Sequence, residues 1–522
     1  MMRWEIPAKP SAKEAKLAAR LKGGSKFFRF LWEIRGELFT PEFQDELIQG
    51  FERKRSDNVP PALMAMVWLL QAYTQASDRD AVDNALFDVR WQLILGTLGV
   101  EDAPFGQGSL PRFRARLVAK DLDRRLVDRT VELARETGLF GFRNLRGVLD
   151  SSPLRGAGRV EDTWNLIGRA MGNLVKAVAT VRGVDPDVLV RELELTTMGP
   201  ASLKANLDID WADQEERAKA FSLLVEEANK LSEWVTRHED LASDEPPIST
   251  AVEDLEAILE QDTEPDPDGH GTKLKRGVAK DRMPSLGDKD MRHGRKSQSF
   301  KFNGYKRFFI TVPGVRLVVG ALVQPANEPE HDATTSLVSD LERHGTLTGL
   351  DFDRGFLAST MVQELRDRGV EIRCKPWRAR NGARFPKSRF RIDLQAGTAT
   401  CPADVTVSIR GKNQEKTRKA SWGRACHTCA LREQCTKAKR GRSVQVHPQE
   451  YLHQELQETI RSEEGRAALR ERVVVEHSLA RLQLLQGSRA RYKGTRKNTM
   501  DVRRYAAINN LYEVRRHLAK AA

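Results

Sequence analysis

Residues 147–153 read GVLDSSP, and this stretch gives the first clear indication of the fold. The apolar run over 145–149 is interrupted only by Arg146 and Gly147, and it ends at Asp150. Short apolar runs of this kind are typical of buried strands. A carboxylate at the end of such a strand is costly to bury without a partner. The pattern predicts a strand that ends in a site carboxylate, with Asp150 as a candidate metal ligand.

Two further acids lie far downstream in comparable settings. Residues 347–352 (LTGLDF) predict a second strand, which runs into Asp353 and then into a helical pattern. Residues 466–487 repeat with a helical period and carry Glu476, with Arg472 one turn before it. Asp351 competes with Asp353, because residues two apart on a strand point to the same face.

Two strand-end aspartates and one helical glutamate can surround a pair of divalent cations. Mg²⁺ prefers carboxylate oxygens, and two-metal sites activate the attacking oxygen and stabilise the leaving one in phosphodiester chemistry. Each acid taken alone is more simply a solvated surface residue, since acids are mostly exposed. The three together favour a site for two Mg²⁺ or Mn²⁺ ions.

The order of these motifs resembles that of DDE transposases of bacterial insertion sequences, which have a ribonuclease-H-like catalytic core. The matching pieces are the VLDSSP strand end, the block over 292–311, the DRGF tetrad over 353–356, the Arg472 and Glu476 pair, and the run over 487–497. The resemblance implies that Asp150, Asp353 and Glu476 form the acidic triad, and it favours Asp353 over Asp351. Arg472 is then a candidate to pair with Glu476 or with the scissile phosphate.

Two positions depart from the pattern of the resembling family. Related transposases often carry a Tyr three residues before the Arg and a Lys seven residues after the Glu. This chain has Leu469 and Gln483 there. The departures concern side chains that grip the transposon end, and they leave the acidic triad intact.

The predicted fold is a multi-domain α/β (α+β) protein around a ribonuclease-H-like mixed sheet. Residues 299–312 and 315–323 predict an antiparallel pair of strands, followed by alternating helices and strands to residue 376. We expect a flexible arm (1–24), a helical DNA-binding domain (25–143), a catalytic core in three pieces (144–154, 298–376 and 460–487), a helical insertion with a loop (155–297), a basic cysteine-bearing insertion (377–459) and a basic helical tail (488–522).

The N-terminal region is helical in pattern and carries clustered arginines. Several short helices joined by polar turns fit a module of the helix-turn-helix kind, with Arg112, Arg114 and Arg116 facing phosphate. A helical bundle with a solvated basic face explains the same pattern equally well. The resemblance favours DNA binding, because this region binds DNA in the resembling family.

Four cysteines fall in the insertion after residue 376. Cys426, Cys429 and Cys435 have the spacing Cys-x2-Cys-x5-Cys, and Cys401 lies 25 positions before Cys426. Four thiolates would form a tetrahedral structural zinc site. Reduced structural cysteines are an equal alternative, because the x5 spacing is unusual for zinc, and an iron–sulfur cluster is a third. Five cysteines in so long a chain do not indicate a disulfide framework.

The positive charge of the chain is concentrated rather than spread. The net charge is +13, yet residues 373–442 alone hold 19 Lys and Arg against 4 Asp and Glu. A basic surplus is the electrostatic footprint of a phosphate-binding protein. Beyond the N-terminal arginines, the candidate DNA contacts are Lys375, Arg378, Arg380, Arg489, Arg491, Lys493 and Lys497.

The N-terminal stretch has no apolar segment of signal-peptide length, and the run over 62–70 is too short to span a bilayer. We therefore expect a cytoplasmic, nucleoid-associated protein without membrane contact.

The sequence thus predicts a transposase that binds terminal inverted repeats of double-stranded DNA and catalyses metal-dependent cleavage and strand transfer. A metal-dependent nuclease on the same core, without strand transfer, is one alternative. A catalytically inactive DNA-binding protein is the other. The resemblance also implies a homodimer on paired transposon ends.

Overall fold

A mixed sheet forms the centre of the computed structural model, which describes residues 2–51, 59–141, 143–238, 241, 245–267, 271–411, 417–471 and 473–521. The sheet contains β1 (Asn144–Arg155), β4 (Arg292–Arg295), β5 (Lys301–Val312), β6 (Leu317–Pro325), β7 (Thr346–Phe352) and β8 (Glu371–Cys374). The strand order is β4-β5-β1-β7-β8, and β6 pairs with β5. The pairs β1·β7 and β7·β8 are parallel and the others are antiparallel. The predicted mixed α/β architecture is confirmed.

The GVLDSSP stretch lies inside the 12-residue strand β1 rather than at its end. β1 continues to Arg155, so the predicted strand end at Asp150 is wrong. The parallel pairing with β7 stops at Val148, whereas the antiparallel pairing with β5 runs on to Arg155. A Cβ on Gly147 would lie 2.7 Å from the Leu341 side chain of the covering helix α14 (Thr334–Glu342), so any larger residue would require this side chain to shift. β4 was also missed, because its residues were assigned to a loop.

The N-terminal region is helical, as predicted. It comprises α1 (Ala12–Arg20), α2 (Lys26–Leu38), α3 (Pro41–Gly50), α4 (Pro61–Thr74), α5 (Asp78–Phe87), α6 (Val89–Leu95), α7 (Ser109–Ala119) and α8 (Leu122–Glu136). The expected flexible arm is instead packed on these helices: Trp4 is buried and its indole N–H donates to the carbonyl of Leu95. α1 also begins with a capping box formed by Ser11 and Glu14.

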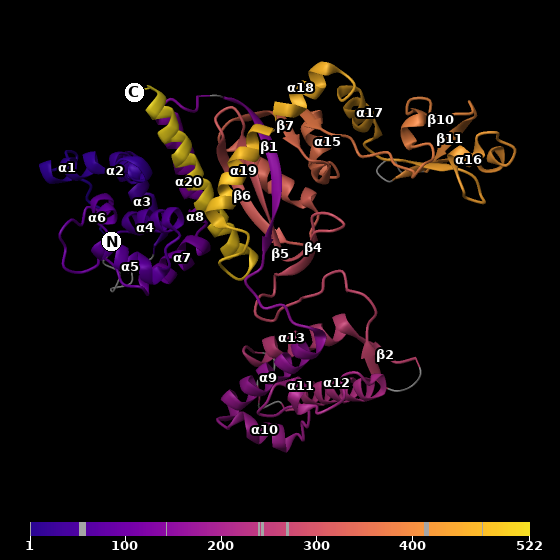
Figure 1. Cartoon of the computed structure of the whole chain (residues 1–522), viewed down its shortest axis with the longest axis horizontal. Coiled ribbons are helices and arrows are strands. Elements are labelled where there is room, and N and C mark those ends of the chain that lie inside the picture. The colour runs from indigo at the N-terminus through magenta and orange to yellow at the C-terminus, as the bar shows by residue number, and fades with distance from the viewer. Residues whose placement is uncertain are drawn as a thin grey trace.

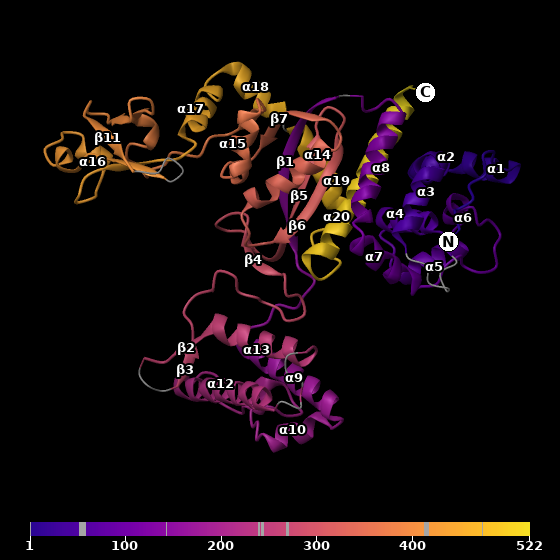
Figure 2. The same cartoon turned by 180° about the vertical axis from the view of Figure 1, so that it is seen from behind.

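The C-terminal segment is part of the core and not a tail. Helix α20 (Thr495–Ala521) packs against both β6 and the N-terminal helices α4 and α8. Figures 1 and 2 show it between the sheet and those helices. Its fully buried Arg504 pairs with Asp501, and Arg503 pairs with the buried Asp123 of α8. One apolar cluster therefore joins the N-terminal helices, the sheet and α20, with members from Trp4 to Val514, while the two insertions have clusters of their own.

Two insertions project from this body (Figure 1). The helical insertion holds α9 (Thr163–Arg182), α10 (Pro186–Glu192), α11 (Leu203–Asn206), α12 (Gln214–Arg237) and α13 (Ile248–Asp262), with a hairpin of β2 (Thr263–Pro265) and β3 (Thr272–Leu274). The cysteine insertion is a five-stranded antiparallel sheet made of β9 (Arg391–Asp393), β10 (Thr398–Thr400), β11 (Thr406–Arg410), β12 (Arg418–Ser421) and β13 (Ser443–Val446). The short helix α16 (Arg432–Cys435) belongs to it, and α17 (Glu450–Thr459) leads back to the core.

Three helices of the core complete the fold around the sheet. They are α14 (Thr334–Glu342), α15 (Thr360–Asp367) and α19 (Val473–Gln486), the last preceded by α18 (Glu463–Glu471). α19 is fixed beside β1, because Arg155 donates its N–H to the carbonyl of Ser488 and accepts from the N–H of Ala490. None of the helices among the described residues is both long and apolar enough to cross a membrane.

Candidate active site

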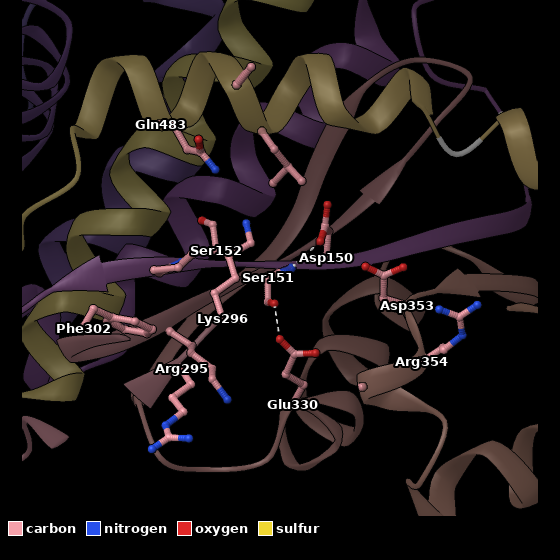
Figure 3. Close-up of a pocket in the computed structure, with 15 residues that line it drawn as sticks. Asp150, Ser151, Ser152, Arg295, Lys296, Phe302, Glu330, Asp353, Arg354 and Gln483 are labelled. Atoms are coloured by element: carbon pink, nitrogen blue, oxygen red, sulfur yellow. Dashed lines mark hydrogen bonds between the residues drawn. The ribbon is translucent and has the colours of Figure 1, made fainter. Parts of the chain in front are cut away.

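The strand register brings Asp150 and Asp353 to the same level of the sheet. Val148 on β1 is paired with Asp351 on β7 in the parallel ladder. Two residues further on, Asp150 lies beside Asp353, which follows the last residue of β7. Adjacent strands lie about 4.8 Å apart, so the two carboxylates are neighbours although 203 positions separate them in the chain. Both line one cleft of about 730 Å³ (Figure 3).

Asp351 is excluded as the cleft residue by its burial. It is 3% exposed and accepts from Arg146 at 2.6 Å, whereas Asp353 is exposed. Burial raises the pKa of Asp351, and the Arg146 guanidinium acts against that rise. The sequence-based preference for Asp353 therefore agrees with the geometry of the cleft.

The third predicted acid cannot be placed fully. Glu476 lies within α19, but its side chain falls outside the described residues, and Arg472 lies outside them altogether. The described part of α19 does reach the cleft, which Leu479, Ala480 and Gln483 line. The side chain of Gln483, one of the two departures from the family pattern, extends from the helix at the top of Figure 3 toward the cleft.

Arg307 fixes α19 against the aspartate-bearing strand. Its side chain is 2% exposed; Nε donates to Ser152 Oγ at 2.8 Å, and Nη1 donates to Gln486 Oε1 at 2.6 Å and to the carbonyl of Gly487. Burial lowers the pKa of Arg307 to about 10, so the guanidinium is charged at neutral pH. Arg307 thereby connects the C-terminal end of α19 to Ser152, which follows Asp150 by two positions on β1.

Several cleft residues were not found from the sequence. Arg295, Lys296 and Lys306 line the cleft together with the aspartates. They lie in the block over 292–311, which carried the resemblance without any assigned role. Burial lowers the pKa of Lys306, and the nearby Glu330 carboxylate opposes this. Glu330 lines the cleft from the loop before α14, and no strand-end or helical pattern pointed to it.

The four insertion cysteines converge on a second cavity, of about 290 Å³. Cys401 follows β10, Cys426 and Cys429 flank one turn, and Cys435 ends α16. The backbone N–H of Arg442 donates to Cys426 Sγ at 3.3 Å. Burial raises the pKa of the Cys435 thiol, and the three other thiols add to the rise. Cys374 is buried in β8 and takes no part.

No three His, Cys, Asp or Glu side chains in the described ranges are already placed to share one metal ion. This holds for the cysteine cavity as well as for the cleft. In the cleft, the described residues supply two aspartates, Asp150 within β1 and Asp353 directly after β7.

The predicted DNA contacts divide into exposed and occupied side chains. Arg114 is half-buried and forms an ion pair with Asp78, so DNA phosphate would have to compete with this carboxylate, and its predicted role stays a prediction. Arg116 lies over the Phe51 ring, and Arg491 donates to the carbonyl of Ala76. Arg491 is nevertheless exposed, as are Arg112, Lys375, Arg378, Arg380, Arg489, Lys493 and Lys497.

Residues 400–515 match the family model described as a transposase DDE domain. This part of the chain is similar to the DDE domain of transposases. The match begins beside Cys401, takes in α19 with Glu476 and includes most of α20. It does not reach Asp150 or Asp353, which are joined to the transposase domain by the sheet and by Arg307. No curated protein and no solved structure matches the chain.

Proposed function

We propose that the protein is a DNA transposase that cleaves and joins DNA with two Mg²⁺ or Mn²⁺ ions held by Asp150, Asp353 and Glu476. The observation that carries the proposal is the parallel register, which brings Asp150 and Asp353 to one cleft beside the helix of the matched transposase domain. Exposed carboxylate oxygens at a shared cleft are the ligands that hard divalent cations prefer.

The period of α19 supports Glu476 as the third ligand. Leu479, Ala480 and Gln483 line the cleft, and position 476 precedes them by three, four and seven residues. Residues at these spacings share one face of a helix. We therefore expect the Glu476 carboxylate to complete the ligand set.

The sheet order supports a ribonuclease-H-like core. Three antiparallel strands, β6-β5-β1, continue into the parallel strands β7 and β8, with the first strand central. This is the strand arrangement expected from the resemblance, with the first two acids on neighbouring central strands.

The bound ions would activate the attacking oxygen and stabilise the leaving oxygen of the phosphodiester. The side chains of Arg295, Lys296 and Arg354 line the same cleft, where their charges can hold the DNA backbone. Hydrolysis breaks one P–O bond and leaves a free 3′-OH. In strand transfer, that hydroxyl forms a new P–O bond with target DNA while the target's own 3′-oxygen leaves, so no covalent link to the protein is needed.

The DNA substrate extends beyond the cleft. Terminal inverted repeats would contact the exposed basic residues of the cysteine insertion and of the run over 487–497, on a homodimer that pairs two transposon ends. The four thiols would hold a structural zinc ion. Zinc binding would require the four sulfur atoms to move toward one ion within their shared cavity.

A plasmid carrying the DNA that flanks the gene tests this proposal. Wild type should nick it in the presence of Mg²⁺, and Asp353→Asn should bind the DNA but not cut it. Asp367→Asn, on the exposed end of α15, is the matched control and should cut normally. Cleavage that never yields joined donor and target DNA would indicate a nuclease, and tight binding without any cleavage would indicate an inactive DNA-binding protein.

A further inference from the structure

Glu330 connects the two segments that carry the cleft aspartates. It is the first residue of the 3₁₀ helix η3 (Glu330–Ala333), between β6 and α14. In Figure 3 its carboxylate points toward Ser151, and both residues line the cleft. The resemblance gave this position no role.

One carboxylate oxygen reaches the strand of Asp150. Glu330 Oε1 accepts a hydrogen bond from Ser151 Oγ at 2.6 Å. The backbone N–H of the same Ser151 donates to Asp150 Oδ1 at 2.7 Å. Ser151 thus contacts both acids, and Glu330 acts on the Asp150 carboxylate through it.

The other oxygen packs against the turn after Asp353. A Cβ on Gly355 would lie 1.9 Å from Glu330 Oε2. The φ angle of Gly355 is not among the positive values, so its backbone does not demand glycine. A side chain at this position of the DRGF tetrad would therefore force the Glu330 carboxylate to move, because the carboxylate occupies the place of the Cβ.

We propose that Glu330 is a positioning residue that sets the spacing of Asp150 and Asp353 and thereby the affinity of the cleft for divalent cations. The proposal rests on the proposed function, since it assumes that these aspartates bind the ions. Mg²⁺ demands near-ideal octahedral geometry, so a small change in ligand spacing weakens its binding. Partners that orient metal ligands typically change metal affinity by about 10–100-fold when they are removed.

The test measures Mn²⁺ binding to the full-length protein without DNA, by electron paramagnetic resonance, and the Mg²⁺ concentration that gives half-maximal cleavage. Glu330→Ala should weaken Mn²⁺ binding and raise the Mg²⁺ requirement about tenfold, with DNA affinity unchanged. Glu330→Gln retains an acceptor for Ser151 and should recover part of the loss. Glu328→Ala, two residues earlier and outside the cleft, is the matched control and should match wild type.

Two combinations separate positioning from a general effect on folding. Ser151→Ala should weaken binding less than Glu330→Ala and should add nothing to it, because both remove the same link. Gly355→Ala should impair the site severely, and Glu330→Ala should partly rescue it by emptying the space that the new methyl group needs.

The inference is overturned if Glu330→Ala, Glu328→Ala and wild type bind Mn²⁺ equally well and Asp353→Asn binds it poorly. Unchanged binding by Asp353→Asn would overturn the proposed metal site and the inference with it. The two failures are therefore distinguishable. Should Glu330→Ala not fold, as judged by circular dichroism, the comparison of Glu330→Gln with Glu328→Gln decides in its place.

Discussion

The two insertions differ in what holds them together, although they interrupt the same core. Among the described residues, the helical insertion has its own apolar cluster of 25 buried residues, built on the long helices α9, α12 and α13. The cysteine insertion has a cluster of seven, two of which are cysteines, under strands of three to five residues. Small domains with little buried apolar surface usually need a metal or a disulfide.

The difference between the two apolar clusters indicates which insertion needs a bound metal ion in order to fold. Burial of apolar side chains at about 25 cal/mol per Å² can stabilise the helical insertion by itself. The cysteine insertion instead brings four thiols to one cavity, and its sheet contributes few buried residues. Its high positive charge adds repulsion that a compact fold must overcome. We therefore expect the stability of one insertion to depend on zinc and that of the other to be independent of it.

Removal of zinc should give the largest effect. Zinc binding to small domains of this kind contributes on the order of 10 kcal/mol to folding, so Cys429→Ser or a strong zinc chelator should unfold residues 377–459. Hydrogen exchange should show loss of protection there and none over 155–297, and metal analysis should find one zinc per wild-type chain. Cys374→Ser, in the core strand β8, should retain the zinc. A wild-type protein that folds without zinc would remove the distinction between the insertions.

Loss of a core side chain should be the next largest effect, and it should act in the helical insertion. Leu174 is fully buried on α9, and Leu→Ala substitutions in such positions typically cost about 2–5 kcal/mol. Leu174→Ala should lower the denaturation midpoint of residues 155–297 without releasing zinc. Leu223→Ala, at a side chain that is 41% exposed, should change it little. Equal effects of the two variants would show that the cluster is not the source of stability.

The comparison also shows what the sequence could reveal. The strands of the core were predictable, since short apolar runs such as residues 347–352 are typical of buried strands. The acids Asp150 and Asp353 stood out because they follow or interrupt such runs. The strand end at Asp150 was misjudged because polar Ser151 and Ser152 suggested a turn, whereas the antiparallel pairing with β5 carries β1 to Arg155.

Other features depend on tertiary contacts that no local pattern contains. Glu330 resembles an ordinary loop acid until the fold places it against Ser151 and Gly355. Arg114 resembles a phosphate contact until Asp78 of another helix pairs with it. The C-terminal segment seemed a basic tail because its charges are numerous, but Arg503 and Arg504 are buried in ion pairs. Charge in a sequence does not tell which charges the fold will neutralise.

A single hydrogen bond should have a smaller effect, within the cysteine insertion. Trp422 is 4% exposed, and its indole N–H donates to the carbonyl of Val405 at 2.8 Å. Trp422→Phe removes this donor, while the carbonyl of Val405 still accepts from the backbone N–H of Cys401, so the loss of one hydrogen bond should cost about 0.5–1.5 kcal/mol. The variant should lose zinc to a chelator faster than wild type does. Trp377→Phe, where no such hydrogen bond is involved, is the control, and an unchanged rate for Trp422→Phe would mean that this contact does not support the sheet.

The smallest expected effect is a pH dependence at the joint between the cysteine insertion and the core, which is formed by His447 and by helix α17 (Glu450–Thr459). Burial lowers the pKa of His447 and of His453, Lys387 adds to this, and Glu450 opposes it. Because both folded-state pKa values lie below the unfolded value of about 6.5, the unfolded state takes up protons first as the pH falls. Stability from these groups is therefore full above that value and declines as the pH falls through the folded-state pKa values.

Hydrogen exchange corrected for intrinsic rates should accordingly show that α17 loses protection between pH 7.5 and pH 5.5, while α9 in the helical insertion does not. His453→Gln, which cannot take up a proton at this position, should reduce the pH dependence of α17. His427→Gln, at an exposed position, should leave it unchanged. An equal loss of protection in α17 and α9 would assign the pH sensitivity to the whole molecule, and the joint would then be no weaker in acid than the insertion that stands on its own apolar cluster.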